Sequence, residues 1–198
     1  MTPQDAAHLL RASTFGFTAE QLRFAVDEGR EKTLERLAAR PAAYAAFEDE
    51  VALLTNREAS EIDKQHLMRY RAMHSPWQRH EKETWFGSVA EERRVKTPVE
   101  FALNLSIAFG VQMAPAELHG KLVVLGQRFH DRGRPRRWLN GFTRVARAKL
   151  AAEILGKVQR FPDRRDLMAL LAQRELPMRG EGRELALAIA SSEEFQWI

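Results

Sequence analysis

The segment from Thr97 to Gly110 constrains the fold of this chain more than any other stretch. It opens with Thr97-Pro98-Val99-Glu100, in which a threonine N-cap, a proline at the first helical position and a glutamate three residues after the cap form a capping box. The sequence FALNLSIAF that follows is apolar on nearly every side, and Gly110 is placed to end the helix. A helix of this kind is buried all round. We therefore expect residues 98–109 to form the central helix of the fold.

Helix signals also account for most of the remaining chain. Thr2-Pro3 and Ser75-Pro76 are typical helix starts, Thr18 is followed three residues later by Gln21, and Gly29 lies where a left-handed C-cap is expected. Residues 42–74 show a weaker helical pattern with a polar break at 55–56, which predicts two helices.

Later helices are predicted to begin at three further positions, Pro115, Asn140 and Asp163. No segment alternates convincingly between apolar and polar residues, as a half-buried strand does. We therefore predict an all-α fold: an irregular multi-helix bundle of about ten helices with no substantial sheet. It forms a single helical domain over residues 1–198, within which 1–90 and 91–198 are candidate sub-units.

Composition excludes several classes of protein. The chain has 198 residues, enough for a sizeable core, and no cysteine, which excludes disulfides, thiolate metal sites and a cysteine nucleophile. It has no run of about 18 to 20 apolar residues, and residues 1–11 lack the basic start and apolar run of an export signal. The sequence as written therefore predicts a cytoplasmic protein without a membrane span.

Positive charge is concentrated in one region. The formal net charge is +4, but residues 128–149 hold eight Lys or Arg and one acidic residue. Within this region the sequence Arg132-Gly133-Arg134-Pro135 matches the core of an AT-hook, whose arginines enter the narrow minor groove of A·T-rich DNA. The alternative is a solvated basic loop between two helices. The candidate anion- or nucleic-acid-binding residues are Arg132, Arg134, Arg136, Arg137 and Arg144.

The sequence contains no motif that specifies a reaction. The six histidines lack the i, i+4 spacing of a helical zinc site, and no nucleophile elbow, phosphate loop or dinucleotide-binding glycine pattern is present. His130-Asp131, beside the arginine cluster, is the nearest approach to a general base or anion-orienting pair. We therefore expect a protein that is not an enzyme and has no cofactor and no metal site. The aromatic residues that could stack on bases or sugars, but that are more often core, are Trp77, Trp85, Phe86 and Trp138.

Four separated segments carry motifs that occur in the same order in a known family. They are AAHLLRASTFGFTAEQL near the start, HSPWQRHEKETWF at 74–86, RVKTPVEF with the later Gly-Gln and Trp-Leu-Asn sequences, and IASSEEFQ near the end. In these segments the chain resembles the bacterial domain-of-unknown-function family eighteen hundred. The motif residues to which the resemblance assigns a structural role are Phe15, Gly16, Pro98, Glu100, Gly126, Trp138 and Asn140.

The chain departs from this family in two places. Trp85-Phe86 runs directly into residues 87–89, so the family's central His-x-His-Phe and Asn-Glu-Asn stretches are missing. In addition, Asp131 to Arg137 replace a loop of prolines, glycines and a tryptophan. The resemblance therefore implies a compact member. Longer members often look exported and are commonly encoded beside a sulfatase-like family.

Three functions are consistent with these features. The first is a non-catalytic scaffold or interaction domain with a protein partner, because a well-capped helical core carries no catalytic constellation. The second is binding of DNA or another polyanion through residues 132–137. The third is a relic hydrolase or sugar-active protein by family analogy alone, which convergence of Glu81, His130 and Asn140 in one cleft would favour.

Overall fold

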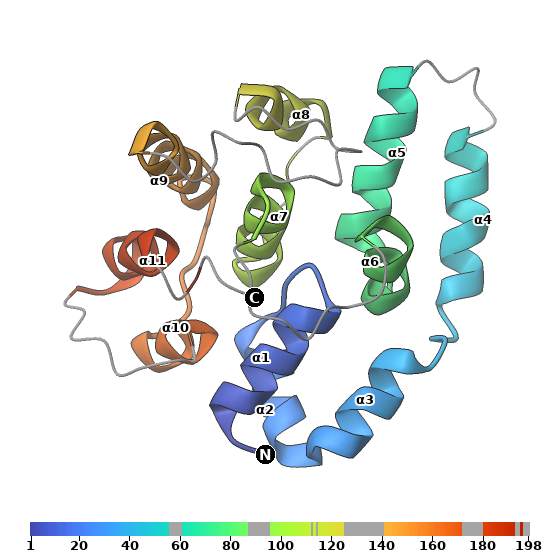
Figure 1. Ribbon diagram of the computed structural model, residues 1–198, viewed down its shortest axis with the longest axis horizontal. Coiled ribbons are helices and arrows are strands. Elements are labelled where there is room, and N and C mark those ends of the chain that lie inside the picture. The colour runs from blue at the N-terminus through green and yellow to red at the C-terminus, as the bar shows by residue number, and fades with distance from the viewer. Residues whose placement is uncertain are drawn as a thin grey trace.

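A computed structural model of the chain describes residues 1–55, 61–86, 96–111, 113, 115–124, 141–171, 180–192 and 195. These residues contain eleven helices and no strand (Figure 1), which confirms the predicted all-α fold and slightly exceeds the predicted number of helices. Within these ranges, no helix has the length and apolar character needed to cross a bilayer. The helices are α1 (Pro3–Ser13), α2 (Ala19–Glu28), α3 (Arg30–Ala38), α4 (Tyr44–Thr55), α5 (Glu61–His74), α6 (Gln78–Phe86), α7 (Pro98–Ala108), α8 (Pro115–Val124), α9 (Gly141–Leu155), α10 (Arg164–Leu171) and α11 (Gly182–Ser191).

Local sequence signals determine how these helices begin and end. The Thr2 side chain caps α1, and complete capping boxes are formed by Thr18 with Gln21 at α2 and by Thr97 with Glu100 at α7. Asp163 also caps α10, because its Oδ1 accepts a hydrogen bond of 2.8 Å from the amide of Asp166. Each cap gives a hydrogen-bond partner to an amide that the first helical turn leaves unpaired. The predicted starts of these helices are therefore confirmed.

Two glycines end helices with positive φ. Gly110 follows α7 with φ +63°, as expected. Gly29 has the positive φ of a left-handed C-cap, +85°, but its ψ of 170° is extended. The predicted left-handed conformation is therefore wrong in ψ. The reason is that Gly29 also precedes the first residue of α3, and an N-cap residue needs an extended ψ. Helix α3 ends at Ala38, three residues before Pro41.

Helix α7 is the centre of the fold, as predicted. Every residue from Pro98 to Ala108 is buried except Ile107, which is half-buried. Figure 1 shows α7 in the middle of the molecule, and it packs against α5, α8 and α9. The main apolar core combines residues from α1, α2, α5, α7, α8, α9, α10 and α11 with Phe195, and so draws on both 1–90 and 91–198. A second, smaller apolar cluster lies between α4 and α5 and contains Tyr44, Phe47 and Val51.

The turn after α1 approaches the backbone of α7 closely at Gly16. A Cβ atom on Gly16 would lie 2.9 Å from Asn104 Cα, 3.2 Å from Asn104 O and 3.0 Å from Ile107 Cβ. The first of these distances is shorter than carbon atoms tolerate, and the α7 backbone cannot move aside as a flexible side chain can. Phe15, the neighbouring residue, is buried in the main core. The Thr-Phe-Gly motif therefore seats this turn on the central helix.

We predict that Gly16→Ala lowers the free energy of unfolding by about 2 kcal/mol, because the added methyl overpacks the contact with α7. Chemical denaturation measures the change. The matched control is Gly120→Ala on α8, where an added Cβ would meet no atom within 4 Å. There the better helix propensity of alanine is expected to raise stability by about 0.5–1 kcal/mol. Equal effects of the two substitutions would contradict the close approach at Gly16.

Candidate functional site

Four charged side chains lie in the interior beside α7. They are Arg11 from α1, Lys82 from α6, Lys96 just before α7 and Glu100 within α7, and each is less than 5% exposed. Lys82 Nζ lies 3.8 Å from Glu100 Oε1. Three of these four groups are cations and one is a carboxylate. Buried charges are costly unless they are paired or hydrogen-bonded. The acceptors of their hydrogen bonds therefore show which parts of the protein these cations stabilise.

The three cations donate to main-chain carbonyls near the ends of other segments. Lys82 Nζ donates to the carbonyls of Arg11 (2.6 Å) and Thr14 (3.0 Å) at the end of α1. Arg11 Nη2 donates to the carbonyl of Leu170 (2.8 Å) at the end of α10. Lys96 Nζ donates to the carbonyl of Phe195 and stands 4.1 Å from the centre of its ring. Carbonyls at helix C-termini carry partial negative charge, so cations are favourable there.

Burial also changes the ionisation of this cluster. Desolvation lowers the pKa of Arg11 to about 10. Desolvation lowers the pKa of Lys96 well below its ordinary value, and the charges of Arg11 and Lys82 lower it further while Glu100 opposes the change. Lys96 is a candidate nucleophile or base by pKa alone. Its ammonium group, however, is enclosed by Phe195 and by Asn104, whose Oδ1 lies 3.4 Å away. The cluster is therefore built to join segments of the fold.

The depressed pKa of Lys96 predicts a pH-dependent stability. Between its folded pKa and the ordinary value of about 10.5, the unfolded chain binds more protons than the folded protein, so stability rises with pH. We expect the free energy of unfolding of the native protein, relative to Lys96→Met, to increase with pH in the range below about 10.5, at up to about 1.4 kcal/mol per pH unit. Denaturation of both proteins across this range measures the difference. A difference that falls with pH would contradict the prediction.

The buried cluster draws on all four segments that carry the family resemblance. Arg11 lies in the first segment, Lys82 in the second, Lys96 and Glu100 in the third, and Phe195 in the last. In this structure the charged motif residues fasten α1, α6, α7 and the C-terminal residues to one another. Glu100 carries a second task as well, because its Oε2 accepts the Thr97 amide at 2.8 Å in the capping box.

A second polar network joins α4, α5 and α6. Arg71 on α5 forms a two-pronged ion pair with Glu81 on α6, at 2.8 Å and 3.1 Å, and contacts Glu48 on α4 at 2.5 Å. Arg71 also donates to the Tyr44 hydroxyl at 2.9 Å. The hydrogen bond from Arg71 lowers the pKa of Glu48, and burial raises the pKa of Tyr44. Glu81 is buried, and its carboxylate is engaged by the Arg71 guanidinium.

Aromatic side chains surround this second network. Trp77 stacks on His80 with their ring centres 4.4 Å apart, and the edge of Tyr44 meets Trp77 at 5.1 Å. Tyr70 lies 4.6 Å from the ring of His74. Trp77 and Tyr70 both pack against the smaller apolar cluster. Trp77 therefore belongs to packing between helices, and His74 and His80 lie against aromatic rings. Among the described residues, no three His, Asp or Glu side chains are grouped to hold a metal.

Helix α4 presents an apolar face to solvent on the side opposite this network. Its inner side buries Tyr44, Phe47 and Val51. On the outer side Leu53 is 73% exposed, whereas Leu54, seven residues after the buried Phe47, lies toward the inner side near the end of the helix and is 44% exposed. Ala45, Ala46 and Ala52 are exposed on the same helix. In Figure 1, α4 stands at the edge of the molecule beside α5, and no other described helix covers its outer side.

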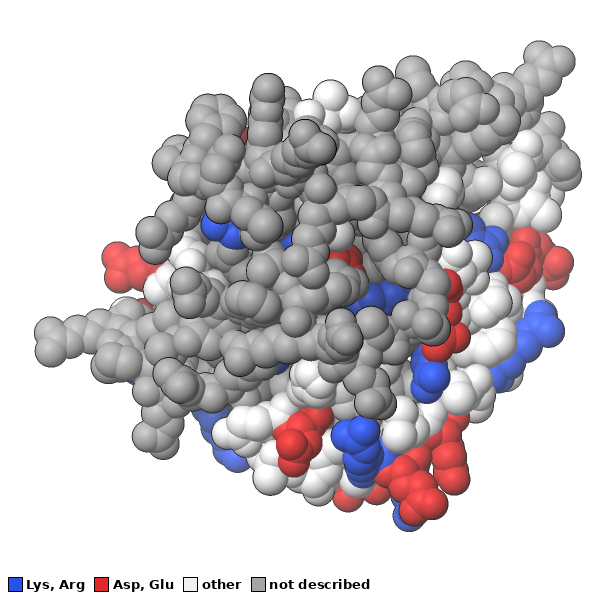
Figure 2. All heavy atoms as spheres, viewed as in Figure 1, with Lys and Arg blue, Asp and Glu red and all other residues white. Residues whose placement is uncertain are grey.

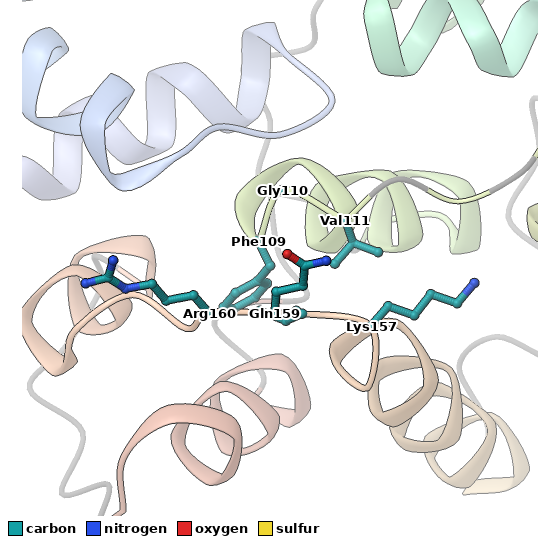
Figure 3. Close-up of a pocket in the computed structure, with 7 residues that line it drawn as sticks. Phe109, Gly110, Val111, Lys157, Gln159 and Arg160 are labelled. Carbon is teal, nitrogen blue, oxygen red and sulfur yellow. The ribbon is translucent and has the colours of Figure 1, made fainter.

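A pocket of about 470 Å³ opens where α7 and α9 end (Figure 3). Its lining includes Phe109 and Gly110 after α7, and Lys157, Gln159 and Arg160 after α9. Figure 3 shows Lys157 and Arg160 extending in opposite directions, with Gln159 between them. Lys157 is bound to Glu117, 2.5 Å away on α8. The two cations therefore do not converge on one ligand, and they stand where basic residues offset the negative ends of two helices.

The predicted site residues fall into two groups. Phe15, Gly16, Pro98 and Glu100 are described, and all four take part in the packing around α7. The remaining predicted residues lie outside the described ranges, apart from Arg144, which is in α9 but whose side chain is not among those described. Those outside are Gly126, His130, Arg132, Arg134, Arg136, Arg137, Trp138 and Asn140. The AT-hook and the convergence of His130 with Asn140 stay predictions.

Two features of the structure were not predicted from the sequence. The first is the inward position of Arg11 and Lys82, since a charged residue in a helix ordinarily faces water. The second is the exposed face of α4. A signal for it exists, because residues 42–54 have alanine or a larger apolar residue on every side of the helix while the surroundings are polar. That pattern does not indicate which side is covered.

Comparisons with models of protein families, with curated proteins and with solved structures found no match. The family resemblance therefore rests on the sequence motifs quoted above.

Proposed function

We propose that this protein is a non-catalytic helical interaction domain and that the outer face of α4 is its docking surface. The observation that carries the proposal is the exposure of Leu53, among the exposed Ala45, Ala46 and Ala52, on a helix whose inner side is engaged. Exposed apolar side chains that lie together on a regular element are typical of protein-interaction sites. As a domain of this kind, it would be a compact member of the family that its motifs resemble.

The attachment of α4 supports this proposal. Its inner side is held by the smaller apolar cluster, by the Glu48–Arg71 ion pair and by the Tyr70 hydroxyl, which donates to Glu50 at 2.5 Å. Rotating the helix to bury Leu53 would expose Phe47 and Val51 and break these contacts. Since the helix is fixed, the outer face is already arranged for a partner, which reduces the ordering cost of binding.

We predict that Leu53→Ser weakens binding of the natural partner about tenfold or more, because this leucine contributes apolar area that the partner covers. A protein that co-purifies with the full chain is isolated, and its affinity for the native and variant proteins is measured by calorimetry. The matched control is Val123→Ser, which removes an apolar side chain of 48% exposure from α8. Equal affinity for all three proteins would rule out α4 as the docking surface.

A second candidate function is DNA binding through the basic sequence at 132–137. It is favoured by the Arg-Gly-Arg-Pro sequence itself and by the eight basic residues among 128–149. Arginines presented by an extended Gly-Pro backbone fit the narrow, electronegative minor groove of A·T-rich duplex.

For this second function we predict preferential binding to A·T-rich duplex DNA that weakens as salt increases, because arginine contacts release counterions. Arg134→Ala should reduce affinity about tenfold, and the loss should be smaller on G·C-rich duplex. Fluorescence anisotropy with the two duplexes measures both effects. Equal affinity for heparin and for either duplex would reduce the observation to unspecific charge attraction.

A further inference from the structure

We infer that the partner segment docking on α4 is a basic amphipathic helix of another protein. This inference rests on the proposed docking function and names the chemistry of the ligand. It follows from three observations on the described residues: the spacing of exposed apolar groups along α4, the charge between them, and the fixed orientation of the helix.

The spacing of the exposed residues on α4 fits a helical partner. Ala46 and Leu53 are seven residues apart and therefore lie on one side of the helix, with Asp49 and Glu50 between them. Ala45 and Ala52 flank this line on one side, whereas Leu54, in line with Phe47, lies toward the inner side of the helix. The alanines allow a second backbone to come close, and Leu53 gives it an apolar side chain to cover. Helices that bind a protein surface offer apolar residues at the matching spacing i, i+3, i+4 and i+7.

The acidic residues on α4 favour a positively charged partner. The helix contains Glu48, Asp49 and Glu50 and no Lys or Arg. Figure 2 shows acidic side chains gathered at the edge of the molecule over α4. Glu48 is committed to Arg71 and Glu50 accepts from Tyr70, whereas Asp49 is exposed and has no hydrogen bond or ion pair with another described residue. Lys or Arg residues that flank the apolar stripe of the partner would complement this acidic group.

A second copy of this chain is a poorer occupant. In a two-fold dimer formed through α4, the same surface meets itself, so Asp49 and Glu50 of one protomer would lie against the acidic residues of the other. Like charges brought together at an interface are unfavourable.

The length of α4 also sets the size of the partner. Its 12 residues span about 18 Å, which matches a partner helix of about three to four turns.

The test uses two synthetic peptides and the full-length protein. The basic peptide has about 14 residues, with leucines at helical spacing on one face and lysines on the flanks. The acidic peptide has glutamate in place of each lysine. Affinity is measured by calorimetry at low and high salt for the native protein and for Leu53→Ser, Asp49→Lys, Glu50→Gln and Val123→Ser. Glu50→Gln removes charge while keeping an acceptor for Tyr70. Circular dichroism checks that the variants are folded.

We expect the basic peptide to bind about tenfold more tightly than the acidic peptide, and this preference to shrink at high salt. Leu53→Ser should abolish most of the binding, Asp49→Lys and Glu50→Gln should weaken the basic peptide selectively, and Val123→Ser should change nothing. A helical signal gained by the peptide on binding would show that the occupant is a helix.

Other results overturn the inference in distinguishable ways. Equal binding of both peptides that is lost in Leu53→Ser would leave α4 as a docking surface and exclude a basic partner. Binding of the basic peptide that persists in Leu53→Ser would reduce the interaction to charge and remove α4 as an apolar site. Self-association of the native protein that Leu53→Ser abolishes would assign the face to a second copy. Failure of both peptides to bind below about 1 mM would exclude this class of ligand, while the partner isolated from the natural source would still test the docking function.

Discussion

The complete burial of α7 is the constraint on which the rest of the structure depends. When a helix has no solvent-facing side, water cannot hydrogen-bond the amides and carbonyls at its ends, so these groups need partners within the protein. The capping box of Thr97 and Glu100 pairs amides at its start, and Gly110 turns the chain away at its end. The neighbouring helices cover its sides, and the turn at Gly16 approaches its backbone so closely that only glycine fits.

The buried cations follow from the same constraint. Helices that end against a central element bring their C-terminal carbonyls into the interior, and Lys82 and Arg11 donate to those at the ends of α1 and α10. Lys96 performs the corresponding task for the carbonyl of Phe195. These charges link segments that are up to 159 residues apart in sequence. The motif residues of the family-like segments are thereby explained by the requirements of the fold, without assigning a reaction to them.

Helix α4 differs from the central helices because only its inner side is used. The network of Arg71, Glu81 and Tyr44 and the smaller apolar cluster fix it against α5 and α6. Leu53 has no place in that cluster and faces outward. A rigid helix that keeps an apolar and acidic face in solvent is suited to bind a partner. The buried charge cluster is not suited to bind a partner, because its donors are directed at the protein's own carbonyls.

The sequence by itself determined the all-α fold, the starts of α1, α2, α7 and α10, and the burial of α7. These depend on interactions within one helix turn, or on an apolar pattern so complete that every arrangement must cover it. Tertiary structure alone decided that Arg11 and Lys82 point inward and that the outer face of α4 stays uncovered. Both depend on which helices meet in space, since a cation is stable in the interior only where distant carbonyls converge on it. Likewise, when a helix has apolar residues on every side, its sequence does not indicate which side the neighbouring helices cover.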